Sequence, residues 1–238
     1  NDLKTISSYI RNHKKALSIV DCVTSIGACH VPVDEWELDI VASGSQKGYM
    51  IPPGLSFISM SEKAWEAAEI SDLPKFYLNL KSYKKSLKNN SNPYTPAVNL
   101  FFALDESLKM MREEGLKNIF ARHDRHKLAI SSAMKALKLK LFADEDHLSP
   151  SITAIETINI DAEEFRKIIK NKFDILLAGG QDHLKGKIFR VGHLGYVNDR
   201  DIITVISAIS NTLLDQNKIT TTQAGEALHV ASKYLDIN

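Results

Sequence analysis

A lysine in a short glycine-containing loop is the first residue whose type and setting could support covalent chemistry. Lys47 lies in the loop 43–48, with the sequence SGSQKG, directly after the apolar run 39–42. A lysine amine can form a Schiff base with a carbonyl compound and can then transfer a proton. The glycines allow a tight turn and the close approach of a ligand. A single lysine in a loop is usually solvated, so Lys47 alone leaves both interpretations open.

Two further charged residues stand where a ligand could bind. Asp21 ends the apolar run 16–21, and ligands of open α/β sheets bind at the carboxyl ends of the strands. A buried carboxylate there needs a cation or a strong donor, although an aspartate could instead cap the turn that follows. Arg190 lies in the apolar run 188–191, where it needs an anion: a substrate carboxylate or the partner of a structural salt bridge.

Together these residue types match what an enzyme needs to use pyridoxal phosphate on amino acids. A lysine holds the aldehyde and moves the proton, and a carboxylate keeps the pyridine nitrogen protonated so that the ring accepts electrons. An arginine binds the substrate carboxylate through two parallel hydrogen bonds. Lys47, Asp21 and Arg190 could fill these roles. None of the three is decisive alone.

The elements that must position these residues follow an α/β pattern in the first half of the chain. Apolar residues at helical spacing predict an amphipathic helix over much of the first sixteen residues. Three short apolar runs, 16–21, 39–42 and 55–58, predict buried strands of an α/β sheet. The segment 71–96 lacks a regular pattern, and its lysines are typical of a solvated face. An apolar helical stripe from 97 to about 116 is predicted to be core: Val98, Phe101, Phe102, Leu104, Leu108 and Met111.

The second half has the pattern of a small α+β domain. Strands are predicted at 152–158, 175–177 and 188–191, and helices at 118–138, 199–214 and 221–235. Asp161 is predicted to cap a further helix that carries Phe165, with Glu164 completing a weaker form of the capping box.

Composition excludes several classes without choosing a function. Apolar residues make up 44% and charged residues 25% of the 238 residues, and the net charge of +1 points to neither nucleic acid nor membrane. No apolar run approaches the roughly 18 residues needed to cross a bilayer, and the chain does not end in a peroxisomal tripeptide, so a cytoplasmic location is expected. The two cysteines, Cys22 and Cys29, match no disulfide framework and no metal pattern.

Several blocks of sequence carry a resemblance to a known family. They are residues 20–25 (VDCVTS), 34–36 (DEW), 39–47 (DIVASGSQK), 52–55 (PPGL), 93–98 (PYTPAV) and 189–195 (FRVGHLG). In this order and at these separations they resemble the class V aminotransferases, and more narrowly the alanine–glyoxylate and serine–pyruvate (serine–glyoxylate) aminotransferases. The resemblance spans nearly the whole chain.

The resemblance implies a role for each of five residues toward pyridoxal 5′-phosphate and substrate. Lys47 would form the internal aldimine, Asp21 would pair with the pyridine nitrogen, and Gln46 would lie close to the ring. Thr95 would reach across a homodimer to the cofactor phosphate in the neighbouring subunit, and Arg190 would bind the substrate carboxylate.

The implied fold is the α/β fold of aspartate aminotransferase. Residues 1–117 would be the C-terminal portion of its large cofactor-binding domain and 118–238 the small α+β domain. The implied reaction is ping-pong transamination between a small amino acid, alanine or serine, and a 2-oxo acid, glyoxylate or pyruvate. Family members are longer at the N-terminus, so the N-terminal segment of the same enzyme and a second subunit are the expected partners.

The same residues bear on several alternative functions. A cysteine desulfurase or other class V lyase of that type needs a reactive cysteine late in the chain, and none follows Cys29. Phosphoserine aminotransferase matches less well around Lys47. Proteins of this kind have also been labelled soluble hydrogenase subunits, but hydrogenase iron needs several thiolates. A catalytically silent interaction protein keeps the fold without the reaction. His123, Asp124 and His126 could bind the metal of a hydrolase, but such a cluster on a charged helix is more often a solvated face.

Overall fold

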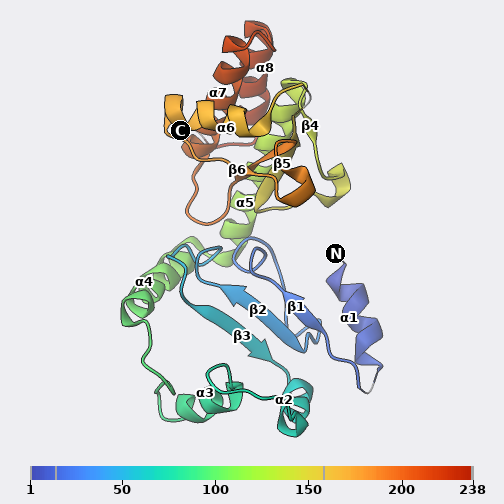
Figure 1. The fold of residues 1–238 in the computed structure, drawn as a ribbon, viewed down its shortest axis with the longest axis vertical. Helices are drawn as coiled ribbons and strands as arrows, with labels where there is room; N and C mark the ends of the chain where they lie inside the picture. Colours follow the sequence, from blue (N-terminus) through green and yellow to red (C-terminus); the bar gives the residue numbers. More distant parts are fainter. Residues whose placement is uncertain (1, 14, 158, 237–238) are drawn as a thin grey trace. The chain divides into compact units, whose positions relative to one another are not determined.

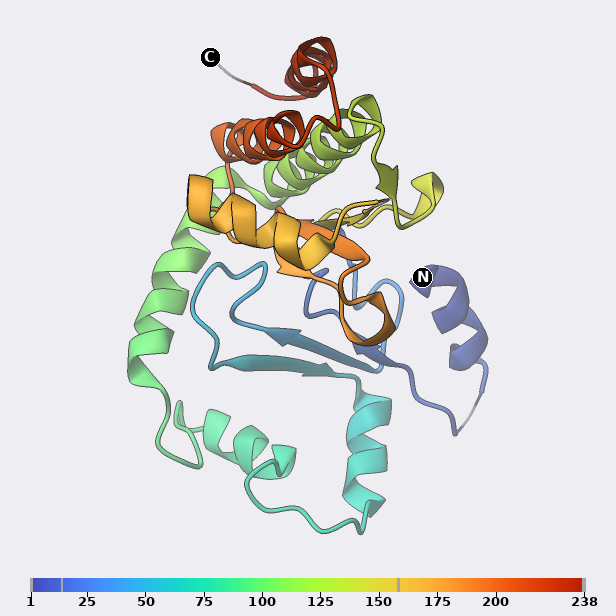
Figure 2. The ribbon, with the colours of Figure 1, turned by 45° about the horizontal axis from the view of Figure 1, so that its top comes forward.

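The computed structural model describes residues 2–13, 15–157 and 159–236, which fall into two compact units (Figures 1 and 2). The first unit comprises Asn1–Ile26 and Val31–Met110, and the second Gly27–His30 and Met111–Asn238. The elements are α1 (Leu3–Arg11), β1 (Ile19–Asp21), β2 (Ile40–Gly44), β3 (Ser56–Met60), α2 (Glu62–Ile70), α3 (Leu80–Leu87), α4 (Val98–Glu114), α5 (Leu116–Ala136), β4 (Lys140–Leu141), η1 (Glu145–His147), β5 (Ile152–Glu156), α6 (Ala162–Phe173), β6 (Ala178–Gly179), η2 (Asp182–Leu184), β7 (Ile188–Gly192), α7 (Asp199–Asp215) and α8 (Thr221–Ser232). None of these helices is long and apolar enough to cross a membrane.

The first unit is built on a three-stranded sheet in the order β1-β2-β3. β1 and β2 run parallel, with Asp21 opposite Ala42, and β3 returns antiparallel to β2. The three apolar runs of the sequence therefore form strands, as predicted. The expectation that all three are buried is wrong for β1 and β3: Ile19 is 74% exposed and Ile58 48% exposed. Among the described residues these two are the outer strands, and only an inner strand has neighbours on both edges.

The helices of the first unit correct the sequence analysis in two places. α2 and α3 were not predicted; Ser61 begins α2 by accepting a hydrogen bond from the N–H of Ala64, as an N-cap serine does. α4 forms where the apolar stripe predicted it, but most of the stripe is exposed rather than core: Phe102 is 73% and Val98 51% exposed, whereas Met111 is buried as predicted. The spacing specifies the helix and its apolar face, whereas the burial of that face depends on what packs against it.

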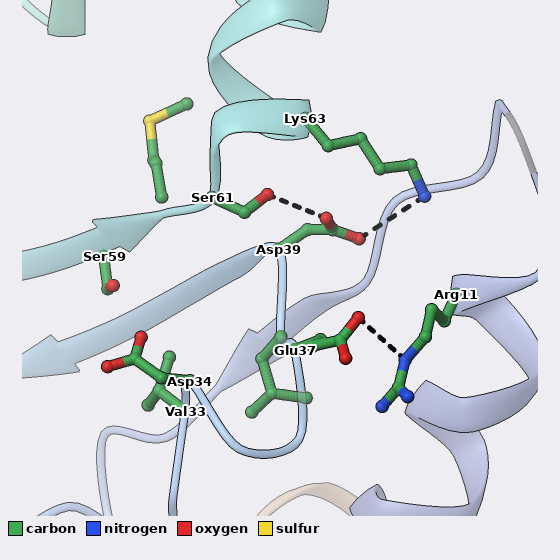
Figure 3. Close-up of a pocket in the computed structure, with 10 residues that line it drawn as sticks. Arg11, Val33, Asp34, Glu37, Asp39, Ser59, Ser61 and Lys63 are labelled. Atoms are coloured by element: carbon green, nitrogen blue, oxygen red, sulfur yellow. Dashed lines mark hydrogen bonds and ion pairs between the residues drawn. The ribbon is translucent and has the colours of Figure 1, made fainter.

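A buried carboxylate joins the sheet of the first unit to α2 (Figure 3). Asp39, only 6% exposed, accepts hydrogen bonds from the Ser18 N–H at 2.9 Å and the Ser61 hydroxyl at 2.8 Å, and the Lys63 Nζ lies 3.9 Å away. The side chain borders a cavity of about 310 Å³ together with Arg11. This cavity lies at the amino end of β2, whereas Lys47 follows the carboxyl end of the same strand.

The second unit packs helices against a four-stranded antiparallel sheet in the order β4-β5-β7-β6. α5, α7 and α8 pack on one another, and α6 contacts β6, β7 and α7 (Figure 2). Its core contains Ile130, Phe165, Phe189 and Ile206, each at most 1% exposed. This is the α+β pattern that the sequence predicted.

Local details of the second unit test two further predictions. Asp161 caps α6 as predicted, accepting a hydrogen bond from the N–H of Glu164 at 2.8 Å. The strand predicted at 175–177 is wrong: the paired strand is β6, and Leu176 is 77% exposed. The described sheet pairs only two residues here, because Asp174 adopts a left-handed conformation that ends α6 and the chain rejoins the sheet at Ala178.

Candidate functional site

Asp21 and the Lys47 loop lie at the same edge of the first unit's sheet. Asp21 is the last residue of β1, and β2 ends at Gly44, three residues before Lys47. Parallel strands end at the same edge, where ligands of α/β sheets bind. The Asp21 side chain is exposed rather than buried, and its Oδ1 accepts a hydrogen bond from the Val23 N–H at 2.9 Å. The carboxylate therefore caps the following turn, and this contact fixes its orientation at the sheet edge.

The loop that carries Lys47 is held by a buried serine. Ser45 is fully buried, and its hydroxyl donates to the Pro52 carbonyl at 2.8 Å while accepting from the Leu55 N–H at 3.1 Å. The Ser45 N–H also donates to the Leu55 carbonyl at 3.0 Å. These bonds close the loop onto the start of β3, so half-buried Lys47 extends from an anchored turn.

A second serine reaches the same loop from α4. The Ser107 hydroxyl donates to the Tyr49 carbonyl at 2.5 Å, and the Met50 N–H donates to the Lys47 carbonyl at 2.9 Å. The Tyr49 ring packs on Phe57 with centroids 4.4 Å apart, and burial raises the pKa of the Tyr49 phenol. Neither Ser45 nor Ser107 was identified from the sequence, because serine is common in loops and helices and only the folded chain shows its partners.

Glycine at position 44 makes room for Gln46. A Cβ on Gly44 would lie 3.0 Å from the Gln46 Oε1 and 3.7 Å from the Val23 Cγ1. The Gln46 side chain therefore folds back over the end of β2, beside the residue whose N–H orients Asp21. The structure thus gathers Asp21, Gln46 and Lys47 at one edge of one sheet.

Replacing Ser45 by alanine is expected to lower the free energy of unfolding by about 1–2 kcal/mol, because it leaves the Pro52 carbonyl and the Leu55 N–H without their buried partner. Denaturant unfolding of the purified protein measures this loss. Ser59→Ala, at an exposed position on β3, is the matched control and should change stability by less than about 0.5 kcal/mol. Equal stability of both variants would show that the Ser45 hydroxyl does not anchor the loop.

Thr95 and Arg190 are not joined to Lys47 by the described contacts. Thr95 is exposed in the connection between α3 and α4, next to Tyr94, whose hydroxyl donates to the Phe76 carbonyl. Arg190 lies half-buried on β7 in the second unit, where its Nε donates to the Gly179 carbonyl at 2.8 Å. Both roles stay predictions.

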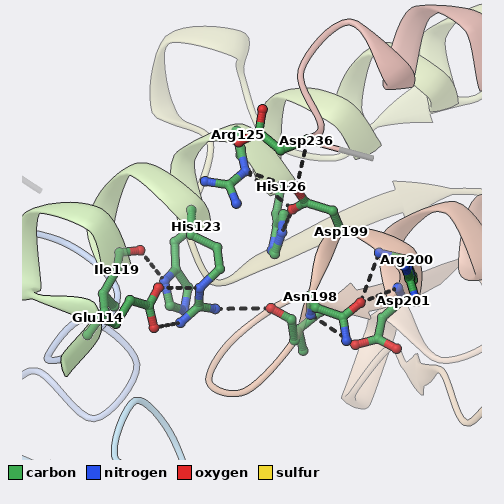
Figure 4. Close-up of polar contacts among 12 residues, drawn as sticks. Glu114, Ile119, His123, Arg125, His126, Asn198, Asp199, Arg200, Asp201 and Asp236 are labelled. Carbon is green, nitrogen blue, oxygen red and sulfur yellow. Dashed lines mark hydrogen bonds and ion pairs between the residues drawn. The ribbon is translucent and has the colours of Figure 1, made fainter. Parts of the chain in front are cut away.

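The histidines of α5 are buried, so the interpretation of this helix face as solvated is wrong for them. Figure 4 shows their polar contacts. His123 is 1% and His126 0% exposed, while Asp124 between them is exposed. The His123 Nδ1 is 2.8 Å from the Ile119 carbonyl, and the Nε2 accepts from the Gly195 N–H at 3.2 Å. These two partners require a neutral ring with its proton on Nδ1, and burial lowers the pKa of the imidazole.

His126 belongs to a network centred on Asp199, at the start of α7. The His126 Nε2 lies 2.6 Å from the Asp199 Oδ1, and the Asp199 Oδ2 accepts from the Asp236 N–H at 2.8 Å. Arg125 completes the network with its Nε 3.2 Å from the same carboxylate. The described residues contain no group of three histidine, cysteine or acidic side chains placed to hold a metal ion. These contacts tie α5, α7 and the residues after α8 together.

Comparisons with known proteins identify the family of the chain. The family model described as aminotransferase class-V matches residues 1–196. The chain is 56% identical over 90% of its length to the protein of Synechococcus sp. (strain PCC 6716) named soluble hydrogenase, small subunit, and covers 56% of it. It is 34% identical over 99% of its length to the serine–glyoxylate aminotransferase of Arabidopsis thaliana, and covers 59% of it.

Among solved structures, the ureidoglycine–glyoxylate aminotransferase of Bacillus subtilis is similar with a TM-score of 0.90 and 32% identity, over 98% of this chain and 62% of that one. The chain therefore spans less than two thirds of the length of each of these proteins. The α/β aminotransferase fold and the motifs around Lys47 and Arg190 lead to the same assignment, which confirms the resemblance found in the sequence. The chain belongs to the class-V aminotransferase family, in the group of the serine– and alanine–glyoxylate aminotransferases.

Proposed function

We propose that the protein carrying this chain is a pyridoxal-phosphate-dependent transaminase. It would move an amino group between a small amino acid, alanine or serine, and a 2-oxo acid, glyoxylate or pyruvate. The observation that carries the proposal is the placement of Lys47 and Asp21 at the carboxyl edge of one sheet in a class-V aminotransferase chain. A lysine amine and a carboxylate at one ligand-binding edge are the two groups that this cofactor needs from the protein.

The residues at this edge fit pyridoxal phosphate. The Lys47 amine stands on a turn anchored by Ser45 and is suited to the cofactor aldehyde. The exposed Asp21 carboxylate, oriented by the Val23 N–H, is suited to a protonated ring nitrogen. Gln46 supplies a side-chain amide beside them. When bound, the cofactor supplies an electron sink that lets the amino acid lose the proton on Cα.

Each residue of the chain then has a defined task. The Lys47 amine would hold the cofactor covalently and would move the proton at the substrate Cα. The Asp21 carboxylate holds the proton on the ring nitrogen. The Arg190 guanidinium binds the substrate carboxylate and so orients the Cα–H bond. Without a second arginine block in the sequence, small uncharged amino acids are the favoured donors.

The proposed role of Thr95 requires a second subunit. In the proposed arrangement its exposed side chain contacts the cofactor phosphate of the neighbouring subunit, so the active form is a homodimer with shared sites. The exposed position of Thr95 supports this role, since a residue that serves a second subunit must be accessible on its own.

The names of similar proteins supply a second candidate. Relatives at 56% identity are named as soluble hydrogenase subunits, which favours a protein that keeps the aminotransferase fold and acts through a partner. Iron chemistry of the hydrogenase kind uses several thiolates, and this chain supplies two cysteines. A silent protein and a transaminase differ in one measurable property, the half-reaction with an amino acid alone.

The half-reaction tests the proposal on the full-length protein loaded with pyridoxal phosphate and freed of excess. Alanine or serine added without an acceptor should yield the matching 2-oxo acid, with about one equivalent per site, because a ping-pong enzyme releases its first product before the acceptor binds. Glyoxylate added next should yield glycine and restore the original absorbance. A protein that binds the cofactor but forms no 2-oxo acid from either donor would instead be the silent interaction protein.

A further inference from the structure

The orientation of Arg190 is fixed by the main chain of β6. β6 pairs antiparallel with β7, with Ala178 opposite Arg190, and the Arg190 Nε donates to the Gly179 carbonyl at 2.8 Å. Within the described part of the chain, no acidic side chain forms an ion pair with Arg190. A structural salt bridge among these residues therefore does not explain the arginine. A guanidinium held through Nε keeps its edge of two Nη groups for a planar anion.

Side chains of α6 hold β6 and the residue before it in place. The Arg166 Nε donates to the Leu177 carbonyl at 2.8 Å, and the Arg166 Nη1 lies 2.7 Å from the Glu163 carboxylate. This ion pair packs directly on Gly179: a Cβ there would lie 2.5 Å from the Arg166 Nη1 and 2.6 Å from the Glu163 Oε1. Only a residue without a side chain lets the pair sit against the strand.

Gly180, the next residue, holds the C-terminal end of the same segment in place through its main chain. The Gly180 N–H donates to the Ile188 carbonyl at 3.1 Å, and a Cβ on Gly180 would lie 2.0 Å from the Leu184 carbonyl oxygen. The carbonyl that orients Arg190 therefore belongs to a segment pinned at Leu177 by a side chain and at Gly180 by the main chain.

We infer that the Arg166–Glu163 pair, acting through the main chain from Leu177 to Gly179, positions the Arg190 guanidinium for the carboxylate of the substrate. The inference rests on the proposed function, in which Arg190 binds that carboxylate. Arg166, Glu163 and Gly179 are positioning residues. Two parallel hydrogen bonds to a carboxylate need the correct plane as well as the correct place, so displacement of the guanidinium by about 1 Å weakens both at once.

Gly179→Ala is the test variant, because its methyl group meets only the ends of two flexible side chains and the fold can accommodate it. It should raise the KM for the amino donor about tenfold while kcat changes less than about threefold, since binding is weakened more than the proton transfer. Arg166→Lys, which keeps the charge but loses the planar Nε–H donor, should act in the same direction. Lys172→Gln is the matched control: it breaks the ion pair of α6 with Asp215 and should leave KM unchanged.

The double variant shows whether the effect passes through Arg190. Arg190→Ala alone should raise KM about 100-fold, and adding Gly179→Ala should raise it no further, because the positioned group is gone. Effects that multiply in the double variant, or an unchanged KM in Gly179→Ala, overturn the inference. An unchanged KM in Arg190→Ala overturns the proposed role of Arg190 and the inference with it.

Hydrogen exchange at the Arg190 Nε–H, followed by NMR in protein labelled with ¹⁵N-arginine, provides a readout without turnover. The bond to the Gly179 carbonyl should slow exchange in the parent protein, and Gly179→Ala should speed it at least about tenfold. Equal exchange rates in the two proteins show that the ion pair does not control Arg190, whatever the outcome of the kinetic arm. If exchange is faster in Gly179→Ala but Arg190→Ala leaves KM unchanged, the contact to Gly179 orients Arg190 as inferred. The part that fails is then the proposed binding of the substrate carboxylate by Arg190.

Discussion

Replacing Lys47 by alanine is expected to abolish covalent attachment of pyridoxal phosphate and to lower transamination by at least about 10⁴-fold. The amine is both the attachment point and the group that moves the proton at the substrate Cα. The methyl group of alanine can do neither. Visible absorbance of the loaded protein and initial rates with alanine and glyoxylate measure the two effects.

Lys85→Ala is the matched control for this variant, because Lys85 is an exposed lysine on α3. It should bind the cofactor and turn over as the parent protein does. If Lys47→Ala kept the visible band and its turnover while remaining folded, the assignment of Lys47 would be wrong.

Lowering the pH from 7 to 5 is expected to reduce the free energy of unfolding by about 2 kcal/mol through His193 alone. His193 is fully buried, and burial, with smaller contributions from His126 and His123, lowers the pKa of its imidazole to about 3. An unfolded histidine titrates near 6.5. Between these values only the unfolded chain binds the proton, so the stability is present above pH 6.5 and is lost as the pH falls toward 3.

His123 and His126 act in the same direction, because burial lowers the pKa of both imidazoles. Urea unfolding at pH 7, 6 and 5 measures the sum. His193→Gln should flatten the decline by removing one of the three protons, whereas His183→Gln, at an exposed position, should leave it unchanged. A free energy of unfolding that stays constant from pH 7 to pH 5 would contradict the conclusion that the three buried histidines are neutral.

Elements and motifs could be predicted from the sequence because both are encoded locally. The apolar runs that became β1, β2 and β3 are strand-length, and the helices of the second unit follow a 3.6-residue period. The Asp21, Lys47 and Arg190 blocks combine unusual residue types with short apolar runs. Tight turns at the ends of strands need few residues to specify, so the places of Asp21 and Lys47 at strand ends could be predicted from the sequence.

Burial and supporting contacts could not be predicted, since they depend on residues far away in the chain. Spacing identifies the apolar face of α4 but not whether another segment covers it, and Phe102 is exposed. The same limit made His126 look solvated, although its partner Asp199 follows 73 residues later. Ser107 reaches Tyr49 across 58 residues, and nothing in the local sequence marks that serine.

Borohydride reduction followed by peptide mass mapping tests the central claim most directly. The full-length protein is incubated with pyridoxal phosphate, reduced, digested and compared with an unreduced sample. A phosphopyridoxyl group fixed on the peptide that contains Lys47 is the predicted result, because the Ser45-anchored turn places Lys47 at the same sheet edge as Asp21. A protein without an adduct, or with the adduct on another lysine, would contradict the assignment of this sheet edge as the cofactor site.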